Sequence, residues 1–172
     1  IKGYSAILTK GRTSNAGFPS DNQNWAFRLT SVGGHAGVNF LFRSRAGEHG
    51  AADWHRWTSK EGFVVGSGWH HVALSYTFGE PGSIRAYIDG KEVEGKWDMG
   101  GATLAPPVVD DDEVWLGSTM GGNPSNSFHG TLDEVALYRH VVPDKIFKSR
   151  FKYVPPRLVL PDPNSGVLQV NM

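Results

Sequence analysis

The stretch GWHHVALSYTFGEPGSIRAYIDGKEV, from Gly68 to Val93, decides the fold class of this 172-residue chain. Apolar residues recur at every second position in two runs, which is the period of a β-strand with one buried face. The first run places Val72, Leu74, Tyr76 and Phe78 on one face, and the second places Ile84, Ala86 and Ile88 on one face. Gly79 to Gly82 predicts a turn between the runs, and Asp89-Gly90 predicts a second, tight turn. The stretch therefore predicts an antiparallel hairpin whose chain then turns back along 91–93.

The same alternation continues toward the N-terminus. Ser5 to Gly11 predicts a strand, and 24–30 and 37–44 predict a hairpin around the turn Gly33-Gly34. In this hairpin the residues expected to share a face are Trp25, Phe27 and Leu29, and Val38, Phe40 and Phe42. Residues 45–60 are less regular, and 63–65 predicts a short apolar strand.

The C-terminal part mixes strands with irregular segments. We expect a long connection over 95–112, a strand over 113–118 and a long strand over 129–140. Pro143 to Phe151 predicts one short helix, because proline suits a first helical turn and the apolar spacing there is helical. The proline-rich residues 153–172 predict an extended spacer that ends in one more strand, VLQVNM. We therefore expect one domain over 1–152 and a tail over 153–172 that leads to another domain.

Composition excludes several classes of protein. The 17 Lys and Arg balance 17 Asp and Glu, and no basic patch stands out, so a nucleic-acid partner is not expected. No apolar run is long enough to span a membrane. The absence of cysteine removes disulfides, thiol catalysis and Cys-zinc sites together. The 22 Gly and 10 Pro indicate many turns, as an all-β domain needs.

Three stretches, in this order, resemble the laminin G-like and pentraxin-like domains of the concanavalin A-type lectin and glucanase superfamily. They are Gly68 to Tyr76, Ser83 to Val93 and Phe128 to Pro143. The resemblance covers about residues 5–152, and it implies an all-β fold, a two-sheet antiparallel jelly-roll sandwich with one short C-terminal helix. Such domains usually open with one further strand before Ser5, which is largely missing from this chain. The final VLQVNM is a candidate to fill that gap at a sheet edge.

The resemblance does not decide whether the protein is an enzyme, because this fold carries lectins, adhesion modules, glycosidases and lyases. A retaining glycosidase needs two carboxylates about 5 Å apart, and in the glucanase relatives these lie on one face of one strand. Asp133 and Glu134 are adjacent here, so on a strand they point to opposite faces. We therefore expect no catalytic residues and a structural role for this pair.

The acidic run Asp110-Asp111-Asp112-Glu113 has two interpretations. One is a solvated acidic turn, and the other is a Ca²⁺ site, because Ca²⁺ takes several oxygen ligands from flexible loops. Pentraxins bind calcium partly through an acidic loop after the strand that EVWLGS matches, and that loop has no carboxylate in this chain. A double site of the pentraxin type is therefore doubtful, and Asp110, Asp111 and Asp112 are candidates for a single ion.

Histidines give no clear site. His70 and His71 are neighbours on an expected strand, so their side chains diverge and do not easily share one ion. The same pair recurs in the family motif, where it is structural, and we expect that role here. His35, His49 and His55 show no ligand spacing. No nucleophile elbow is present, although sequence alone does not exclude a Ser-His-Asp triad.

Aromatic residues give the best candidates for ligand binding, because lectin-like sites stack sugar rings on exposed aromatics beside polar side chains. The leading cluster is Trp54, His55, Arg56 and Trp57, and weaker candidates are Trp25 and Trp97. The alternative is that Trp54 and Trp57 cover a sheet edge as part of the core. Arg85 and Tyr87 face away from the apolar side of their strand. They either line the other face of that sheet or are covered by residues 95–112.

The sequence thus favours a non-catalytic module that binds carbohydrate or protein. We expect it within a larger exported multidomain protein, in an extracellular, periplasmic or cell-surface location. One alternative is a structural or assembly domain that docks neighbouring domains or subunits. A weaker alternative is a glycan-active enzyme of the same fold. The expected partners are a glycan or protein ligand and adjacent domains, and Ca²⁺ is the one cofactor considered.

Overall fold

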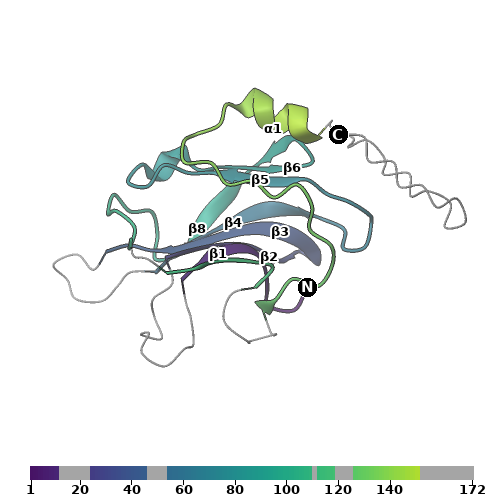
Figure 1. Ribbon diagram of the computed structural model, residues 1–172, viewed down its shortest axis with the longest axis horizontal. Helices are drawn as coiled ribbons and strands as arrows, with labels where there is room; N and C mark the ends of the chain where they lie inside the picture. The colour runs from purple at the N-terminus through teal and green to yellow at the C-terminus, as the bar shows by residue number, and fades with distance from the viewer. Residues whose placement is uncertain (12–23, 46–53, 110–111, 119–125, 152–172) are drawn as a thin grey trace, which may run out of the picture.

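The computed structural model describes residues 1–11, 24–45, 54–109, 112–118 and 126–151. Within them two antiparallel sheets lie in separate layers, and a short helix lies outside the smaller sheet (Figure 1). The two-sheet antiparallel sandwich with one C-terminal helix is therefore confirmed.

The larger sheet has six strands in the order β8-β4-β3-β2-β1-β9. Their bounds are β1 (Tyr4–Lys10), β2 (Trp25–Val32), β3 (His35–Arg43), β4 (Trp54–Phe63), β8 (Gly95–Met99) and β9 (Val114–Leu116). The predicted first strand, the hairpin around Gly33-Gly34 and the strand near 113–118 are confirmed. The strand β1 pairs with β2 on one side and with β9 on the other, so it is not an edge strand.

The smaller sheet has three strands in the order β5-β6-β7, namely β5 (Val72–Ser75), β6 (Arg85–Ile88) and β7 (Lys91–Val93). A short 3₁₀ turn, η1 (Pro81–Ser83), lies between β5 and β6. The predicted Asp89-Gly90 turn is confirmed: both residues have positive φ, 51° and 73°, as a type I′ hairpin turn requires. The strand β5 is shorter than predicted: the alternation of apolar residues continues to Phe78, but the strand ends at Ser75.

The core lies between the two sheets. Alternate residues of β3 point into it, and Val38 and Phe42 have no exposed surface. The Phe42 ring lies 5.6 Å from the Tyr76 ring and 5.1 Å from the Phe78 ring, so the residues just after β5 fill the core as their alternation predicted. A cluster around Val38 joins the sheets through Trp57 and Ile88.

Two predictions for the middle of the chain were wrong. Residues 45–60 were expected to be less regular, but β4 begins at Trp54 and pairs with β3 and with the edge strand β8. Residues 95–112 were expected to be a connection, but β8 occupies 95–99. The strand β4 carries polar residues on both of its faces, and β8 carries only one large inward aromatic residue. The alternation of apolar residues is therefore too weak to reveal either strand.

The expected long strand over 129–140 was also wrong, because these residues form no strand. Glu134 has φ of 52°, which breaks an extended backbone. The segment is instead held by Phe128 and Leu132, which pack against the buried cluster of Ile7 and Leu29. The separate strand expected over 63–65 is also absent, because Phe63 is the last residue of β4. Val64 and Val65 follow the strand and are each 56% exposed.

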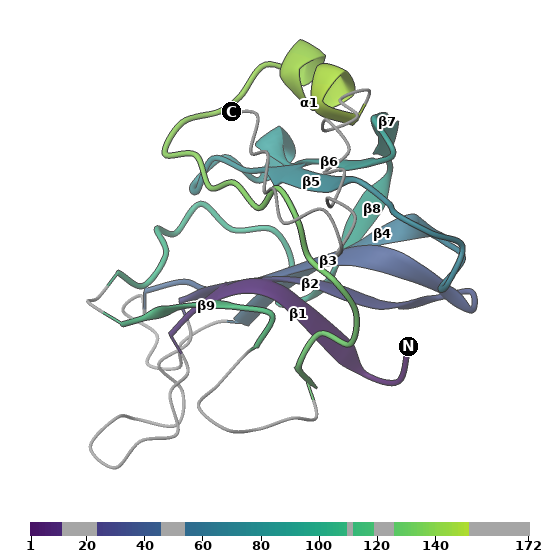
Figure 2. The ribbon, with the colours of Figure 1, turned by 45° about the vertical axis from the view of Figure 1, so that its right-hand side comes forward.

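The helix α1 (Asp144–Phe151) confirms the predicted one, with Pro143 directly before it. It lies on the outer side of the smaller sheet, so the molecule has three layers (Figure 2). Phe147 is buried with its ring 4.9 Å from that of Tyr87, which anchors the helix to β6. The predicted tail over 153–172, with VLQVNM, lies outside the described residues. No helix in the described ranges is long and apolar enough to cross a membrane.

Candidate functional site

The larger sheet has one face turned away from the smaller sheet, which we call the outer face. In the views of Figures 1 and 2, the smaller sheet and α1 both lie on the opposite side of the larger sheet. Side chains alternate along each strand, so every second residue of the larger sheet points to this face. The pairing of Ala6 with Arg28, Arg28 with Asn39 and Asn39 with Thr58 places these residues in one row across it.

Arg28 and Asn39 form the buried part of this row. Arg28 is 3% exposed and Asn39 is fully buried. The Arg28 guanidinium donates from Nε and Nη2 to Asn39 Oδ1, at 2.9 and 2.6 Å. The Asn39 amide in turn donates to Thr58 Oγ1 at 2.8 Å. A buried guanidinium is costly unless it is hydrogen-bonded, so this fixed amide stabilises it.

The row closes into a ring of side chains through β8 and β1. Thr58 Oγ1 donates to Asp98 Oδ2 at 3.1 Å, and Arg56 Nε donates to Asp98 Oδ1 at 2.7 Å. Arg56 also donates from Nη1 to the Tyr4 hydroxyl. The Arg28 guanidinium carbon lies 3.8 Å from the centre of the Tyr4 ring, so Tyr4 lies over Arg28.

We call this ring the outer-face network: Tyr4, Arg28, Asn39, Arg56, Thr58 and Asp98. Its members come from five neighbouring strands. The hydrogen bond with Asp98 raises the pKa of Arg56, and partial burial opposes that rise. Arg56 and Asp98 each keep about a quarter of their side chain exposed, at 25% and 24%. A cation, a carboxylate and an aromatic ring, held rigidly and partly open to solvent, are the groups that bind sugar hydroxyls and rings.

The predicted cluster of Trp54, His55, Arg56 and Trp57 is divided by its own strand. Trp54 and Arg56 lie on the outer face, since they pair with Arg43 and Leu41 of β3. His55 and Trp57 point into the core and are 3% and 4% exposed. His55 stacks on Phe42, and its ring nitrogens lie 2.8 Å from the Gly101 carbonyl and 3.1 Å from Ser44 Oγ. These two residues are therefore structural, which corrects their choice as ligand candidates.

The weaker candidates lie away from the outer face. Trp25 pairs with Phe42 on the inner face, and Trp97 packs between Phe42 and Tyr76. Tyr87 is fully buried beneath α1, where burial, aided by Asp144, raises the pKa of its hydroxyl. Arg85 is about half exposed on the smaller sheet and pairs with Glu92 at 3.3 Å. Tyr87 was therefore wrong as a ligand candidate, and the helix covers it rather than residues 95–112.

A Ser-His-Asp arrangement occurs at the end of β4, outside the network. His70 Nδ1 lies 2.8 Å from Asp89 Oδ2, and its Nε2 lies 2.7 Å from Ser67 Oγ. Ser67 Oγ also lies 2.5 Å from the Val64 carbonyl, which competes with His70 for the one hydroxyl proton. The second Asp89 oxygen accepts the His71 N–H at 3.0 Å. These bonds fix the loop 64–71 on the β6–β7 turn, as the structural interpretation of His70-His71 expects.

Acidic residues form no metal site in the part of the chain described. No group of three or more His, Cys, Asp or Glu side chains that could hold an ion occurs among the described residues. Asp110 and Asp111 lie outside them, and the Asp112 carbonyl accepts a hydrogen bond from Lys10 Nζ. Asp133 accepts the backbone N–H of Glu134. The calcium site therefore stays a prediction.

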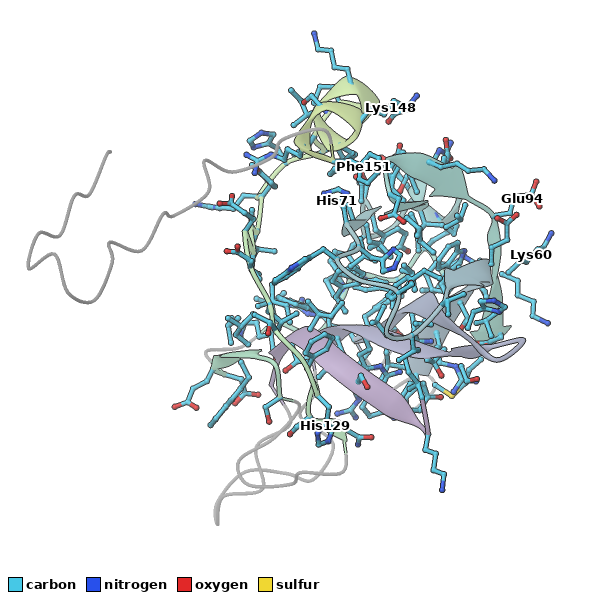
Figure 3. All side chains as sticks on the ribbon, turned by 90° about the vertical axis from the view of Figure 1, so that its right-hand side faces the viewer. Lys60, His71, Glu94, His129, Lys148 and Phe151 are labelled. Carbon is cyan, nitrogen blue, oxygen red and sulfur yellow. The ribbon has the colours of Figure 1, made fainter. Side chains whose placement is uncertain are left out.

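Among the residues that the structure describes, charged side chains at the edge of the larger sheet form an ion pair. Lys60 Nζ lies 2.8 Å from Glu94 Oε2, with both side chains largely exposed (Figure 3). This pair carries no net charge and is screened by solvent. It leaves the outer-face network as the main polar assembly of this sheet in the described residues.

The comparisons with known proteins agree with the fold. A family model described as the concanavalin A-like lectin/glucanases superfamily, of the laminin G type, matches residues 5–145. Neither the search of curated proteins nor the search of solved structures found a match.

Proposed function

Because the chain belongs to the concanavalin A-like lectin/glucanase superfamily, we propose that it is a non-catalytic module that binds a glycan on the outer face of its larger sheet. The observation that supports this proposal is the outer-face network. It brings six side chains from five strands into one rigid, partly open surface. Trp54 lies on the same face, two residues from Arg56, and supplies an aromatic surface for a sugar ring.

The arrangement suits binding better than turnover. The one carboxylate of the network, Asp98, is held by both Arg56 and Thr58. Glycoside hydrolysis needs a second carboxylate at a suitable distance, and the described strands bring none into the network. A glycan-active enzyme remains the weaker alternative, and hydrolysis of polysaccharides that is lost in Asp98→Asn would support it.

A glycan array tests the proposal. The wild-type protein should bind a defined set of glycans, and Trp54→Ala should weaken binding about tenfold or more, since stacking residues at a binding centre contribute more than about 1.4 kcal/mol. Trp69→Ala is the matched control, because Trp69 is 69% exposed but lies in the loop before β5. Trp57→Ala is unsuitable here because Trp57 is buried.

The array has clear outcomes. Loss of binding in Trp54→Ala with binding kept in Trp69→Ala supports the outer face. Equal loss in both variants, or no binding of any glycan by the wild type, would reject the proposal.

A second candidate function is assembly with a neighbouring domain or subunit. It is favoured by three exposed apolar residues of the loop after β4, namely Val64, Val65 and Trp69. Exposed apolar surface often marks protein contacts. Size-exclusion chromatography of the wild-type protein and of its Trp69→Ser variant tests this function. It would be rejected if both proteins elute strictly as monomers and neither binds a partner.

We also retain the exported location and the single Ca²⁺ as proposals. Asp110, Asp111 and Asp112 would supply oxygen ligands for that ion. Calcium titration by calorimetry, together with melting curves, tests the ion. The absence of both binding heat and a change in melting temperature would exclude the ion.

A further inference from the structure

The helix α1 and the segment that leads into it carry an excess of cations. Residues 135–151 include Arg139, Lys145, Lys148 and Arg150 but only one carboxylate, that of Asp144. The balanced charge of the whole chain hides this excess, so the expectation that no basic patch stands out is wrong for this segment. All four cations are exposed, and none of them forms an ion pair with another residue that the structure describes.

Contacts hold the two parts of this segment together on the outside of the smaller sheet. The Arg150 guanidinium carbon lies 5.5 Å from the centre of the Tyr138 ring, so the chain before the helix lies against its last turn. Beneath them, Val142 and Phe147 are buried in one cluster with Tyr87. We call the exposed side of this unit the α1 surface, and it comprises Leu137, Arg139, Val141, Lys145, Lys148 and Arg150.

Apolar side chains of the α1 surface are exposed beside its cations. Leu137 is 63% exposed and Val141 is 59% exposed, and each is two residues from Arg139. Cations together with exposed apolar groups match the boundary of a lipid bilayer, which offers anionic headgroups next to acyl chains. A soluble polyanion would contact the cations alone and would leave these apolar side chains in water.

We propose that the α1 surface binds the surface of a membrane that contains anionic phospholipids. The cations contact the lipid phosphates, and Leu137 and Val141 enter the boundary between headgroups and acyl chains. Each cation near such a surface raises the affinity about fivefold, so four cations alone give weak binding, and the apolar contact adds a second, independent contribution.

Asp144 is the group of this segment that opposes an anion. Burial raises the pKa of the Tyr87 hydroxyl and Asp144 raises it further, so the carboxylate lies close to Tyr87. Asp144 lies in the first turn of α1, whereas Lys148 and Arg150 lie in the last turn. The carboxylate therefore lowers the net charge of the segment but does not cover its cations.

This inference is independent of the proposed function. The helix lies beyond the smaller sheet, whereas the outer face is the far side of the larger sheet (Figures 1 and 2). A membrane bound at the α1 surface would leave the outer face directed away from the lipid and open to a glycan.

Vesicle co-sedimentation of the intact protein tests the proposal. The vesicles are made of phosphatidylcholine alone or with about 30% phosphatidylglycerol, which supplies the negative surface potential. The anionic vesicles should bind about tenfold or more tightly in about 50 mM NaCl, and this preference should fall in about 500 mM NaCl because salt screens exposed charges. Equal binding to both kinds of vesicle, or binding to neither, would overturn the proposal.

Paired substitutions locate the surface. The double variant Lys145→Gln with Lys148→Gln should bind anionic vesicles about twentyfold less tightly, from about fivefold for each cation. The matched control is Lys60→Gln with Lys91→Gln, which removes two exposed lysines that pair with glutamates and lie outside the α1 surface. The control should weaken binding much less. Equal weakening by the two double variants would show a general effect of protein charge and would overturn the proposal.

The apolar contact distinguishes a membrane from an acidic protein. Leu137→Ser should weaken binding to the anionic vesicles about threefold or more, because it removes apolar surface that the bilayer buries. Leu116→Ser is the matched control, since Leu116 is 57% exposed on β9 of the larger sheet. Polyglutamate at an equal concentration of anionic groups should not displace the protein from the vesicles. Displacement by polyglutamate, or unchanged binding of Leu137→Ser, would indicate an acidic protein segment as the partner and would overturn the membrane proposal.

Discussion

One histidine beside the smaller sheet is partly buried. His71 lies directly before β5, and its Nδ1 has no hydrogen-bond partner among the described residues. Burial lowers the pKa of His71, with the Asp89 carboxylate raising it and the Arg150 guanidinium lowering it further. The folded protein therefore prefers the neutral ring more strongly than the unfolded chain does.

This preference predicts a loss of stability in acid. A group whose pKa is lower when folded takes up its proton more readily in the unfolded chain, so stability falls as pH drops below about 6.5, the ordinary His value. His71→Gln should show a shallower fall in melting temperature between about pH 7 and pH 5. His129→Gln is the control, because His129 is exposed at the opposite end of the molecule (Figure 3). If the melting temperatures of the wild type and of His71→Gln fall equally between about pH 7 and pH 5, His71 is not the source of the acid sensitivity.

At the scale of elements, the close contact between β4 and the end of β8 sets the position of Trp54. Gly100 has φ of 67°, and a Cβ atom there would lie 1.8 Å from the Trp54 carbonyl oxygen. Gly101 has nearly the same φ, 68°, but a Cβ atom there would meet nothing within 4 Å. The pair separates the cost of backbone conformation from the cost of a steric clash.

We expect Gly101→Ala to cost about 1 kcal/mol, from the left-handed backbone alone. Gly100→Ala should cost about 1–3 kcal/mol more, because β4 or β8 must also move. Urea unfolding of both variants measures the difference. Gly100→Ala should also weaken glycan binding, since Trp54 would shift, and equal stability of the two variants would show that the close contact is not rigid.

How well each element could be predicted depends on its neighbours. The hairpin of β5 and β6 was predictable because each strand alternates clearly and Asp89-Gly90 forces the turn. The strand β4 was missed because its buried residues include His55 and Ser59, whose hydrogen bonds replace apolar contacts. The segment 129–140 alternates like a strand, but a ladder needs a partner strand, and alternation alone does not supply one.

The candidate site shows the same limit. Trp54 and Arg56 were selected because they are neighbours in sequence, and that proximity also selected the buried His55 and Trp57. The remaining members of the outer-face network are Tyr4, Arg28, Asn39, Thr58 and Asp98. Most of them lie far from Arg56 in sequence, so only strand order and register bring them together. A sequence signal existed in the polar positions between the apolar residues of β2 and β3, but it did not give their partners.

At the scale of the whole molecule, the two sheets are unequal. Six strands face three, so the smaller sheet cannot cover the part of the inner face near β1 and β9. Val114 and Leu116 of β9 are accordingly 51% and 57% exposed. Residues 126–132 supply part of the missing cover: Phe128 donates its N–H to the Gly117 carbonyl at 2.8 Å, and its side chain packs with Leu132 on the Ile7 cluster.

A segment without regular secondary structure should therefore contribute to global stability. Leu132→Ala should lower the free energy of unfolding by about 1–3 kcal/mol, less than a fully buried leucine would cost because Leu132 is only partly buried. Leu137→Ala is the matched control: the same substitution, five positions along the same segment, at a side chain that is 63% exposed. It should change stability by less than about 0.5 kcal/mol. If denaturant unfolding gives the two variants equal stability, residues 126–132 do not close the sandwich, and the inner face near β9 must be covered by other residues.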